Sequence, residues 1–579
     1  MSTVSEYSND CLQQLLTLKA ASRLGAADPA LFSTDETAQS QIANSLGWVR
    51  LASNQAEQLA EIVALADSAH AEGLEAVVLI GQGGSSQAAM TITKLHEVAS
   101  AATRPVAFRT MDSLSPVFVN HILGSSDPAK TIYIVASKSG STIEPLMLER
   151  VAWRYAAAHL GSAKAASRFV AITEEGSELA KLAEERNYRQ VLFAQKNVGG
   201  RFSALTAFSL LPAALVGIDV NAVLAEAAEV EAQCVIDSPE NPAIQLACFL
   251  YSAYLDGRDK FSLVMPPSGQ VFGLWIEQMI AESLGKDGIG IVPNVEVDAS
   301  ILAVPHVDRS VITYAVGEVD GFAESIANID PSIPQLHMTI DDPVQAYSRF
   351  VVWEYATAFI SLLMQVDPFD QPDVELTKVI TRRLLDGENN GNNFSYVQYS
   401  SQDSFVYELR MSKALADCES ELSSSDSEDP SLDQLLRVLL GSFTPGDHFC
   451  LNAFLPFRGY GRREALERMR NRTASRLGVV SCLEIGPRYL HSTGQLHKGG
   501  PNNGVFMILS SDEINDIQVP GTTMTLGLLA ATQAKADFQA LAERGRRVLH
   551  VHLVDNDSET LSRFADRFCS AISAVKVPS

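Results

Sequence analysis

Apolar runs alternate with helix-like stretches from about residue 73 onwards, and this rhythm restricts the folds open to the chain. The runs AVVLIG, VAFRTM, TIYIVAS, FVAIT and VLFA are each long enough for one strand, and each is followed by a helical stretch. Strands that alternate with helices favour a parallel, doubly wound sheet. We therefore predict an α/β fold that binds its ligand at the carboxyl ends of the strands.

The length of 579 residues suits more than one domain. Residues 1–66 show apolar positions three and four apart, which predicts a helical segment. The alternation of strands and helices predicts a first doubly wound domain over residues 67–235 and a second one over residues 236–579. Within the second domain, residues 387–430 are rich in Asn, Ser, Gln, Asp and Glu, which favours an exposed insertion or a mobile linker.

Charge and composition exclude several kinds of partner. The formal net charge of −25 argues against nucleic acid and anionic membranes, because a phosphate backbone would be repelled. No apolar run is long enough to span a membrane, and the first residues lack the features of a secretory signal, so we expect a soluble, cytoplasmic protein. The seven cysteines form no CxxC pair and the histidines show no metal-ligand spacing, so no metal site is expected.

The stretch LIGQGGSSQ, residues 79–87, joins a predicted strand to a predicted helix. Gly83 and Gly84 let backbone amides approach an anion, and Ser85 follows near the positive end of the helix. A tight turn without a ligand is the alternative. A dinucleotide site is disfavoured, because position 86 holds serine where the third glycine of that motif would stand.

The stretch SKSGST, residues 137–142, follows another strand of the same sheet. It offers the hydroxyls of Ser137, Ser139, Ser141 and Thr142, again at the start of a helix. Helix capping is the alternative role for these side chains. Because two such loops on neighbouring strands converge, we favour a compact phosphate monoester over a nucleoside triphosphate, whose lysine-serine signature is missing.

Four further segments carry a resemblance to a known family. They are VGGRFS, EQMIAESLGKDGIGIVP, DPFDQPDVELTK and YLHSTGQLHKGGPNNG. Together with the two loops they resemble phosphoglucose isomerase, over about residues 40–560 and most closely the isomerase portion of bifunctional transaldolase/phosphoglucose isomerase proteins. The resemblance implies two sugar-isomerase (SIS) sheets with the active site in the crevice between them. Because this pattern fills nearly the whole chain, we expect no transaldolase portion.

The family's chemistry assigns expected roles to residues of this chain. It implies reversible isomerisation of glucose 6-phosphate and fructose 6-phosphate through a cis-enediol, with Glu282 as the base, Arg201 stabilising the enediolate, and Lys378 and His491 assisting ring opening. His497 is the alternative histidine. The residues expected to bind substrate are Gly83, Gly84, Ser85, Ser137, Lys138, Ser139, Ser141, Thr142, Gly200, Gln278, Gln371 and His497. No cofactor is implied, because no electrons leave the substrate, and a homodimer is expected.

Two rival functions remain open at this point. An isomerase of broader scope, which also accepts mannose 6-phosphate, would carry the same residues, since epimer choice depends on pocket shape. A regulatory protein that binds a sugar phosphate without converting it could share the fold. The joint presence of Glu282, Arg201 and Lys378 counts against the second rival, because binding alone does not need them.

Overall fold

The computed structural model describes the chain except for a few short gaps, and it divides into two compact units. The described residues are 6–54, 56–99, 106–296, 298–317, 321–342, 344–387, 396–400, 407–419, 431–455, 462–513, 515–554 and 558–575. Unit 1 comprises Met1–Asp112, His121–Leu284 and Ile291–Asp370, and unit 2 comprises Ser113–Asn120, Gly285–Gly290 and Gln371–Ser579. Within the described ranges, no helix combines the length and the apolar character needed to cross a membrane.

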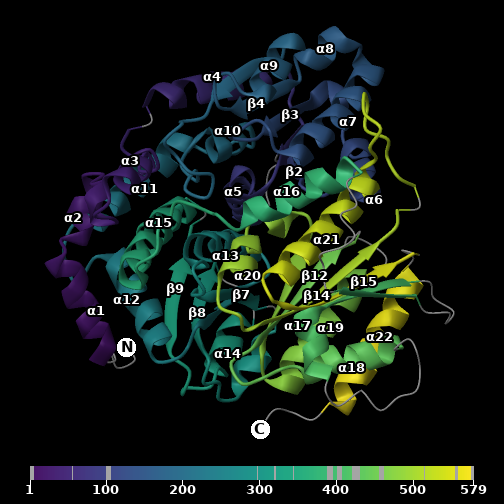
Figure 1. Ribbon diagram of the computed structural model, residues 1–579. Coiled ribbons are helices and arrows are strands. Elements are labelled where there is room, and N and C mark those ends of the chain that lie inside the picture. Colours follow the sequence, from purple (N-terminus) through teal and green to yellow (C-terminus); the bar gives the residue numbers. More distant parts are fainter. Residues whose placement is uncertain are drawn as a thin grey trace. The chain divides into compact units, whose positions relative to one another are not determined.

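Unit 1 begins with helices and continues into a five-stranded parallel sheet (Figure 1). The first helices are α1 (Glu6–Thr17), α2 (Ala20–Gly25), α3 (Glu36–Ala43) and α4 (Ala56–Ala71). The strands are β1 (Ala76–Gly81), β2 (Ala107–Met111), β3 (Thr131–Ala136), β4 (Phe169–Thr173) and β5 (Gln190–Phe193). The connecting helices are α5 (Gln87–Ala99), α6 (Pro116–Gly124), α7 (Ile143–Leu160), α8 (Ser162–Ala166) and α9 (Glu178–Glu185). The first part of α6, up to Asn120, is counted with unit 2.

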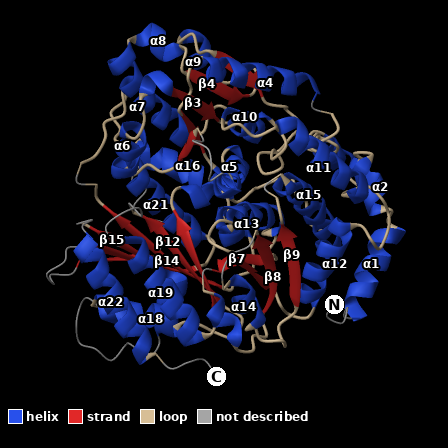
Figure 2. Cartoon of the chain, turned by 180° about the vertical axis from the view of Figure 1, so that it is seen from behind, coloured by secondary structure: helices blue, strands red, loops and turns tan. Residues whose placement is uncertain are grey.

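In the strand order β2-β1-β3-β4-β5, the winding direction reverses between the neighbouring strands β1 and β3. β1 and β3 are buried along their whole length, as expected for parallel strands with helices on both faces, and this is why their sequences are continuously apolar. Figure 2 shows the strands in red embedded among blue helices. The predicted doubly wound α/β fold is therefore confirmed for this part of the chain.

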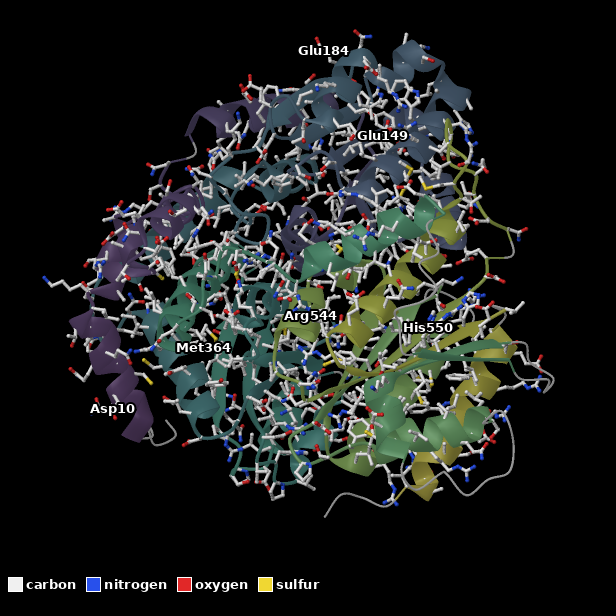
Figure 3. The ribbon with its side chains drawn as sticks, viewed as in Figure 1. Asp10, Glu149, Glu184, Met364, Arg544 and His550 are labelled. Atoms are coloured by element: carbon white, nitrogen blue, oxygen red, sulfur yellow. The ribbon has the colours of Figure 1, made fainter. Side chains whose placement is uncertain are left out.

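Helix α7, which follows the second of the two predicted loops, is anchored near its middle by a buried acid. Glu149, labelled in Figure 3, is fully buried and accepts hydrogen bonds from the Arg186 guanidinium and the Tyr188 hydroxyl, both just after α9. A buried carboxylate with charged and neutral donors resists displacement, because breaking the set would leave an unpaired charge. Helix α7 is thus joined to the segment between α9 and β5.

A second sheet completes unit 1. Its strands run parallel in the order β7-β6-β8-β9 and are β6 (Lys260–Val264), β7 (Val292–Glu296), β8 (Arg309–Val316) and β9 (Gln335–Ile340). The helices of this part are α10 (Ala207–Leu215), α11 (Val220–Cys234), α12 (Pro242–Leu255), α13 (Gln270–Leu284), α14 (Phe322–Ala327) and α15 (Gln345–Met364). Helix α13 is joined to α5 of the first sheet, because the Thr91 hydroxyl donates to the Val271 carbonyl at 3.2 Å.

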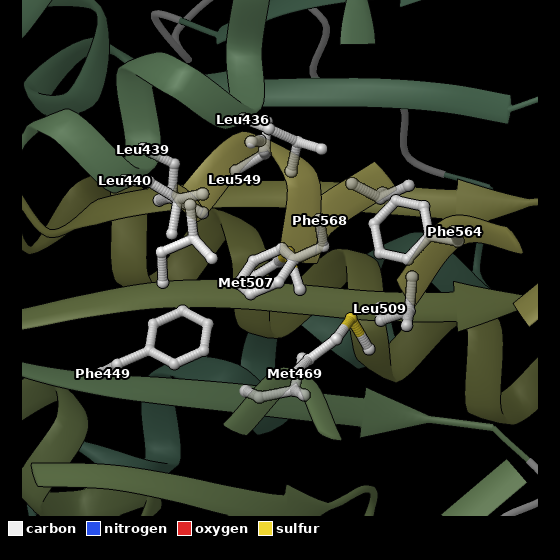
Figure 4. Close-up of a cluster of buried hydrophobic side chains, with 14 of the residues drawn as sticks. Leu436, Leu439, Leu440, Phe449, Met469, Met507, Leu509, Leu549, Phe564 and Phe568 are labelled. Carbon is white, nitrogen blue, oxygen red and sulfur yellow. The ribbon is translucent and has the colours of Figure 1, made fainter. Parts of the chain in front are cut away.

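Unit 2 holds a six-stranded mixed sheet in the order β10-β11-β15-β14-β12-β13. Its strands are β10 (Tyr396–Ser400), β11 (Tyr407–Ser412), β12 (His448–Phe454), β13 (Val480–Ile485), β14 (Gly504–Ser511) and β15 (Arg547–Leu553). Its helices are α16 (Val374–Leu385), α17 (Lys413–Ala416), α18 (Leu432–Gly441), α19 (Arg462–Leu477), α20 (Gly494–Gly499), α21 (Leu526–Glu543) and α22 (Ser558–Ala574). Figure 4 shows the core of this unit, where apolar side chains of α18, α19 and α22 pack on β12, β14 and β15.

The structure departs from the sequence-based expectation at two points. Residues 236–579 contain two sheets where a single one was expected, so the described residues form three sheets rather than two. The polar region 387–430 is only partly described, and its described residues include β10 and β11, which pair antiparallel with each other and with β15. Leu409 and Met411 alternate with polar residues and are buried, so this part is a strand of the sheet rather than a linker.

Candidate active site

The two predicted phosphate loops lie at the same edge of the five-stranded sheet. β1 and β3 are direct neighbours, and their last paired residues are Gly81 and Ala136. Each loop starts immediately after its strand, at the carboxyl end, where parallel α/β sheets bind ligands. The predicted neighbourhood of the two loops is therefore confirmed, whereas their ligand stays a prediction.

The loop after β1 is built on glycine for a steric reason. Gly83 has a positive φ of 53°, which favours glycine. A Cβ on Gly84 would lie 2.1 Å from the carbonyl oxygen of Gly200 and 2.8 Å from the Arg201 nitrogen, distances that no side chain allows. The loop Gly83–Ser85 therefore lies directly against the backbone of the predicted Gly200–Arg201 segment.

The loop after β3 has hydroxyls that bond to one another rather than to the helix that follows. The Ser137 hydroxyl donates to the Thr142 oxygen at 3.2 Å, and Ser141 donates to the Ser139 hydroxyl at 3.1 Å. Thr142 occupies the N-cap of α7 but its side chain makes no capping bond. Gly140 has a φ of 63° and lies tightly against Ser177. Capping thus does not explain why this loop is rich in hydroxyls.

Lys138 of the same loop is held by residues outside it. Its ammonium lies 3.2 Å from the Glu174 carboxylate and donates to the carbonyl of Lys196 at 3.0 Å. The side chain is about a quarter exposed. The Lys138 side chain is therefore held in place by Glu174 and the Lys196 carbonyl, and its ammonium remains partly exposed.

Arg201 is the most heavily engaged side chain of the site. It is 5% exposed. Its Nε donates to the Ser283 hydroxyl at 2.8 Å, and its Nη2 donates to the carbonyls of Pro368 and Asp370, the second at 3.0 Å. Its Nη1 lies 3.3 Å from Oε1 of Glu282. A planar guanidinium with donors in a fixed fork suits such a set of acceptors better than any other side chain.

Glu282 lies near the end of α13 with a second contact on its own helix. Gln278, one turn earlier, donates from Nε2 to Oε2 of Glu282 at 3.0 Å, which confirms that the two residues share a helix face. The Glu282 side chain is 14% exposed. Each carboxylate oxygen is thus fixed by one named donor, in a site that admits little water.

Sequence reasoning missed the acceptors that hold Arg201. Ser283 was visible in the motif AESLGK, where it follows the glutamate directly, but a serine on an apolar helix carries no distinctive signal. The contacts with Pro368 and Asp370 use backbone carbonyls, which no residue type reveals. The DPFD part of the third motif therefore contributes its backbone to the site.

The remaining predicted residues belong to unit 2. Gln371 is half-buried and is the first residue of the longest stretch of this unit. Lys378 lies on α16 with its side chain 46% exposed and pairs with Glu375 at 2.6 Å. His491 ends a short helical turn, Arg488–His491, and is half-buried. Their roles stay predictions.

His497, the alternative histidine, is buried in unit 2. Its ring packs against Tyr489 and Phe506, and its Nε2 lies 3.7 Å from the Cys450 sulfur. Burial, with the charge of Lys498 nearby, holds the pKa of His497 well below its usual value. This ring is therefore neutral in the folded protein near neutral pH.

The sheets and their connecting helices define an α/β protein with largely parallel sheets. Two solved structures have a similar fold. A hypothetical protein from Thermus thermophilus is 24% identical with a TM-score of 0.54, covering 65% of this chain and 97% of that one. A glucose-6-phosphate isomerase from Chlamydia trachomatis D/UW-3/Cx is 18% identical with a TM-score of 0.52, covering 66% of this chain and 84% of that one.

Sequence comparison relates part of the chain to a particular family. Residues 34–298 match the model of the phosphoglucose isomerase family. Glucose-6-phosphate isomerase from Streptococcus pyogenes serotype M28 (strain MGAS6180) is 29% identical over 383 residues, which cover 58% of this chain and 85% of that protein. The enzyme of the same name from Acholeplasma laidlawii (strain PG-8A) is 28% identical over 59% of this chain and 90% of its own length.

The family match has a boundary that matters for the site. It includes both phosphate loops, Arg201 and Glu282, and it ends before Gln371 and Lys378. It is narrower than the span of about 40–560 over which the motifs resemble the family. The relation to bifunctional transaldolase/phosphoglucose isomerase proteins stays a prediction.

Proposed function

We propose that the protein catalyses the reversible interconversion of glucose 6-phosphate and fructose 6-phosphate. One series of contacts inside unit 1 carries this proposal. The glycine loop after β1 lies against Gly200 and Arg201, and the Arg201 side chain reaches Glu282. The candidate anion-binding loop and the carboxylate base Glu282 are thereby connected through Arg201. All of these residues lie within residues 34–298, which match the phosphoglucose isomerase family. Aldose–ketose isomerisation of a sugar phosphate needs both parts.

Glu282 is the base in this proposal. Its carboxylate takes the proton from C2 of open-chain glucose 6-phosphate, the electrons of the broken C–H bond form the C1–C2 double bond, and the C1 carbonyl electrons move to the oxygen on C1. The proton then returns to C1, and the carbonyl forms at C2 as the proton of the C2 hydroxyl passes to the oxygen on C1. Gln278 holds one carboxylate oxygen at 3.0 Å and so sets the direction of the other. Arg201 offers its guanidinium to the negative charge that develops on the enediolate oxygen. Low exposure of Glu282 limits loss of the transferred proton to water.

Ring opening is assigned to residues of unit 2. We place Lys378 and His491 there, with Gln371 as a further contact to the sugar, on the strength of their motifs. We prefer His491 to His497 for this role. His497 is enclosed by aromatic rings and has a lowered pKa, which makes it a poor proton donor.

The 6-phosphate is assigned to the loops after β1 and β3. Glycines 83, 84 and 200 allow backbone amides to approach it, and Ser85, Ser137, Lys138, Ser139, Ser141 and Thr142 supply hydroxyls and a cation. The loop after β3 supports this role, because its hydroxyls are prearranged by mutual hydrogen bonds and not used for capping. Locally placed donors are necessary in a protein with a net charge of −25.

Removing single hydroxyls from this loop tests the phosphate assignment. Ser137→Ala and Thr142→Ala are each expected to raise KM for fructose 6-phosphate about tenfold with a smaller change in kcat, since a hydrogen bond to a charged group contributes roughly 1.5–3 kcal/mol. Steady-state kinetics measure both constants. Thr525→Ala is the matched control, because Thr525 does cap its helix, α21; it should lower Tm and leave KM alone. An unchanged KM in both loop variants would refute the assignment.

The overall activity has a direct test. Purified protein is given fructose 6-phosphate, and the glucose 6-phosphate formed is followed with a coupled dehydrogenase. Turnover supports the proposal, and a comparison with mannose 6-phosphate separates a strict isomerase from one of broader scope. Binding of fructose 6-phosphate without turnover would instead favour a regulatory sugar-phosphate sensor.

The partners follow from the same proposal. A small sugar phosphate is the substrate, and we propose a cytoplasmic homodimer that needs no cofactor and binds neither nucleic acid nor membranes. The strongly negative net charge supports the exclusion of nucleic acid.

A further inference from the structure

Two short segments of unit 2 continue directly from the residues of the proposed site. Gly285–Gly290 begins three residues after Glu282 along the chain, and Asp373 follows Asp370, whose carbonyl accepts from Arg201, by three residues. Three residues span about 10 Å at most. Lys378 follows Asp373 by five positions on α16, which has Asp373 at its N-cap. A group that fixes these two segments therefore restrains the chain next to each of the proposed acid-base residues.

The side chain of Gln495 on α20 holds both segments at once. Its Nε2 donates to the carbonyl of Gly285 at 3.0 Å and to Oδ2 of Asp373 at 2.7 Å. Its Oε1 accepts from the backbone nitrogen of Asp373 at 2.9 Å. The residue is fully buried. One amide thus uses both donor hydrogens and its oxygen to join two segments that lie far apart in the sequence.

Neighbouring groups tighten the same junction. A Cβ on Gly499 would lie 2.2 Å from Oδ2 of Asp373 and 2.9 Å from the Gly285 carbonyl, so only glycine fits there. The Gly499 carbonyl accepts from the nitrogen of Gly288 at 2.9 Å. Arg544, labelled in Figure 3, forms an ion pair with Asp373. The turn after α13 and the start of α16 are therefore both packed closely on α20.

Helix α20 is itself anchored inside unit 2. The Lys498 ammonium lies 2.6 Å from Oδ1 of Asp537 on α21, and both side chains are almost fully buried. The Arg546 guanidinium donates to the carbonyls of Lys498 and Gly500 at 2.7 Å each. A buried ion pair and two charge-assisted hydrogen bonds hold α20 in one position. The Gln495 amide is thus presented from a rigid support.

We propose that Gln495 is a positioning residue for the isomerisation, which joins the turn following Glu282 to the start of the helix that carries Lys378. This inference rests on the proposed function and adds to it. It also gives the pattern TGQLHKGG a structural role, because Gln495 and Gly499 form the junction and Lys498 supports it.

Gln495→Glu tests the inference with almost no change in shape. The substitution removes both donor hydrogens and sets a carboxylate against the Gly285 carbonyl and the Asp373 carboxylate. We expect kcat to fall about 10- to 100-fold, the loss that a misplacement near 1 Å causes, with KM for fructose 6-phosphate within about twofold of wild type. The fall in kcat should lessen at lower pH, where the introduced carboxyl becomes protonated and can donate again.

A second measurement on the same full-length protein is independent of activity. Hydrogen exchange of the amides in residues 285–290 and 371–378 should speed up in Gln495→Glu. The double variant Gln495→Glu/Asp373→Asn restores a donor-acceptor pair between the two side chains and should recover part of the lost kcat. Gln533→Glu makes the same chemical change at another buried glutamine of unit 2 and should leave kcat and the exchange of both segments unchanged.

The outcomes separate this inference from the activity on which it rests. Unchanged exchange in both segments overturns it whatever the activity, and so does faster exchange with an unchanged kcat. A fall of kcat in Gln533→Glu as large as in Gln495→Glu also overturns it. A wild-type protein that binds fructose 6-phosphate without converting it overturns the proposed function instead.

Discussion

Glu282→Gln should lower kcat for fructose 6-phosphate by about 10³-fold, and KM should change little. General acid-base catalysis by one side chain contributes typically 10² to 10⁴ in rate, and here a single carboxylate both removes and returns the proton. Glutamine keeps the shape of the side chain and can still face Arg201 and Gln278. Binding through the phosphate loops does not involve this residue, so substrate affinity should survive.

Coupled-enzyme kinetics measure the fall in kcat, and proton exchange at C1 of fructose 6-phosphate in D₂O measures the first chemical step alone. Exchange should disappear in Glu282→Gln. The matched control is Glu277→Gln, the same change at a nearby glutamate of α13, for which we expect kcat close to wild type. Equal losses in the two variants, or exchange that persists in Glu282→Gln, would contradict the assignment of the base.

Arg201→Lys should reduce kcat/KM about 100-fold. The guanidinium reaches the Ser283 hydroxyl, two backbone carbonyls and Glu282, and a lysine has one nitrogen with which to replace three. Each buried acceptor left without a donor costs about 1–3 kcal/mol. The Glu282 carboxylate would also lose one of its two named contacts. Because the variant retains the positive charge, a fall in kcat/KM would show that the planar arrangement of the guanidinium donors matters in addition to the charge.

Kinetics and thermal unfolding of the variant should be measured together. Arg258→Lys is the matched control, because Arg258 also belongs to unit 1 and donates to two backbone carbonyls, those of His306 and Arg309. It should lose stability comparably and keep kcat/KM near the wild-type value. If Arg201→Lys retained full kcat/KM, the proposed role in stabilising the enediolate would be wrong.

The amino-acid sequence was sufficient to predict the five-stranded sheet and the loops that follow two of its strands. Continuous apolar runs are a strong signal because parallel strands are buried on both faces, and β1 and β3 carry that signal without interruption. The shared helix face of Gln278 and Glu282 was equally predictable, since it follows from a spacing of four residues.

Other features had no local signal. The residues that hold Arg201 include two backbone carbonyls from a segment more than 160 positions away, which residue types cannot reveal. Strand β11 was hidden because the composition of its surroundings is polar, although Leu409 and Met411 alternate as an edge-region strand requires. The junction made by Gln495 depends on three segments far apart in the sequence, and only the folded chain brings them together.

Unit 2 is assembled from three separate stretches of the chain, and this affects when it can form during translation. The segment Gly285–Gly290 leaves the ribosome long before α20 has been translated, yet the two are hydrogen-bonded in the finished unit. The turn next to Glu282 can therefore take its final form only after most of the polypeptide has been made. Nascent or prematurely terminated chains would carry every residue of unit 1 and still lack this junction, so catalytic competence would arrive late, as a property of the completed chain.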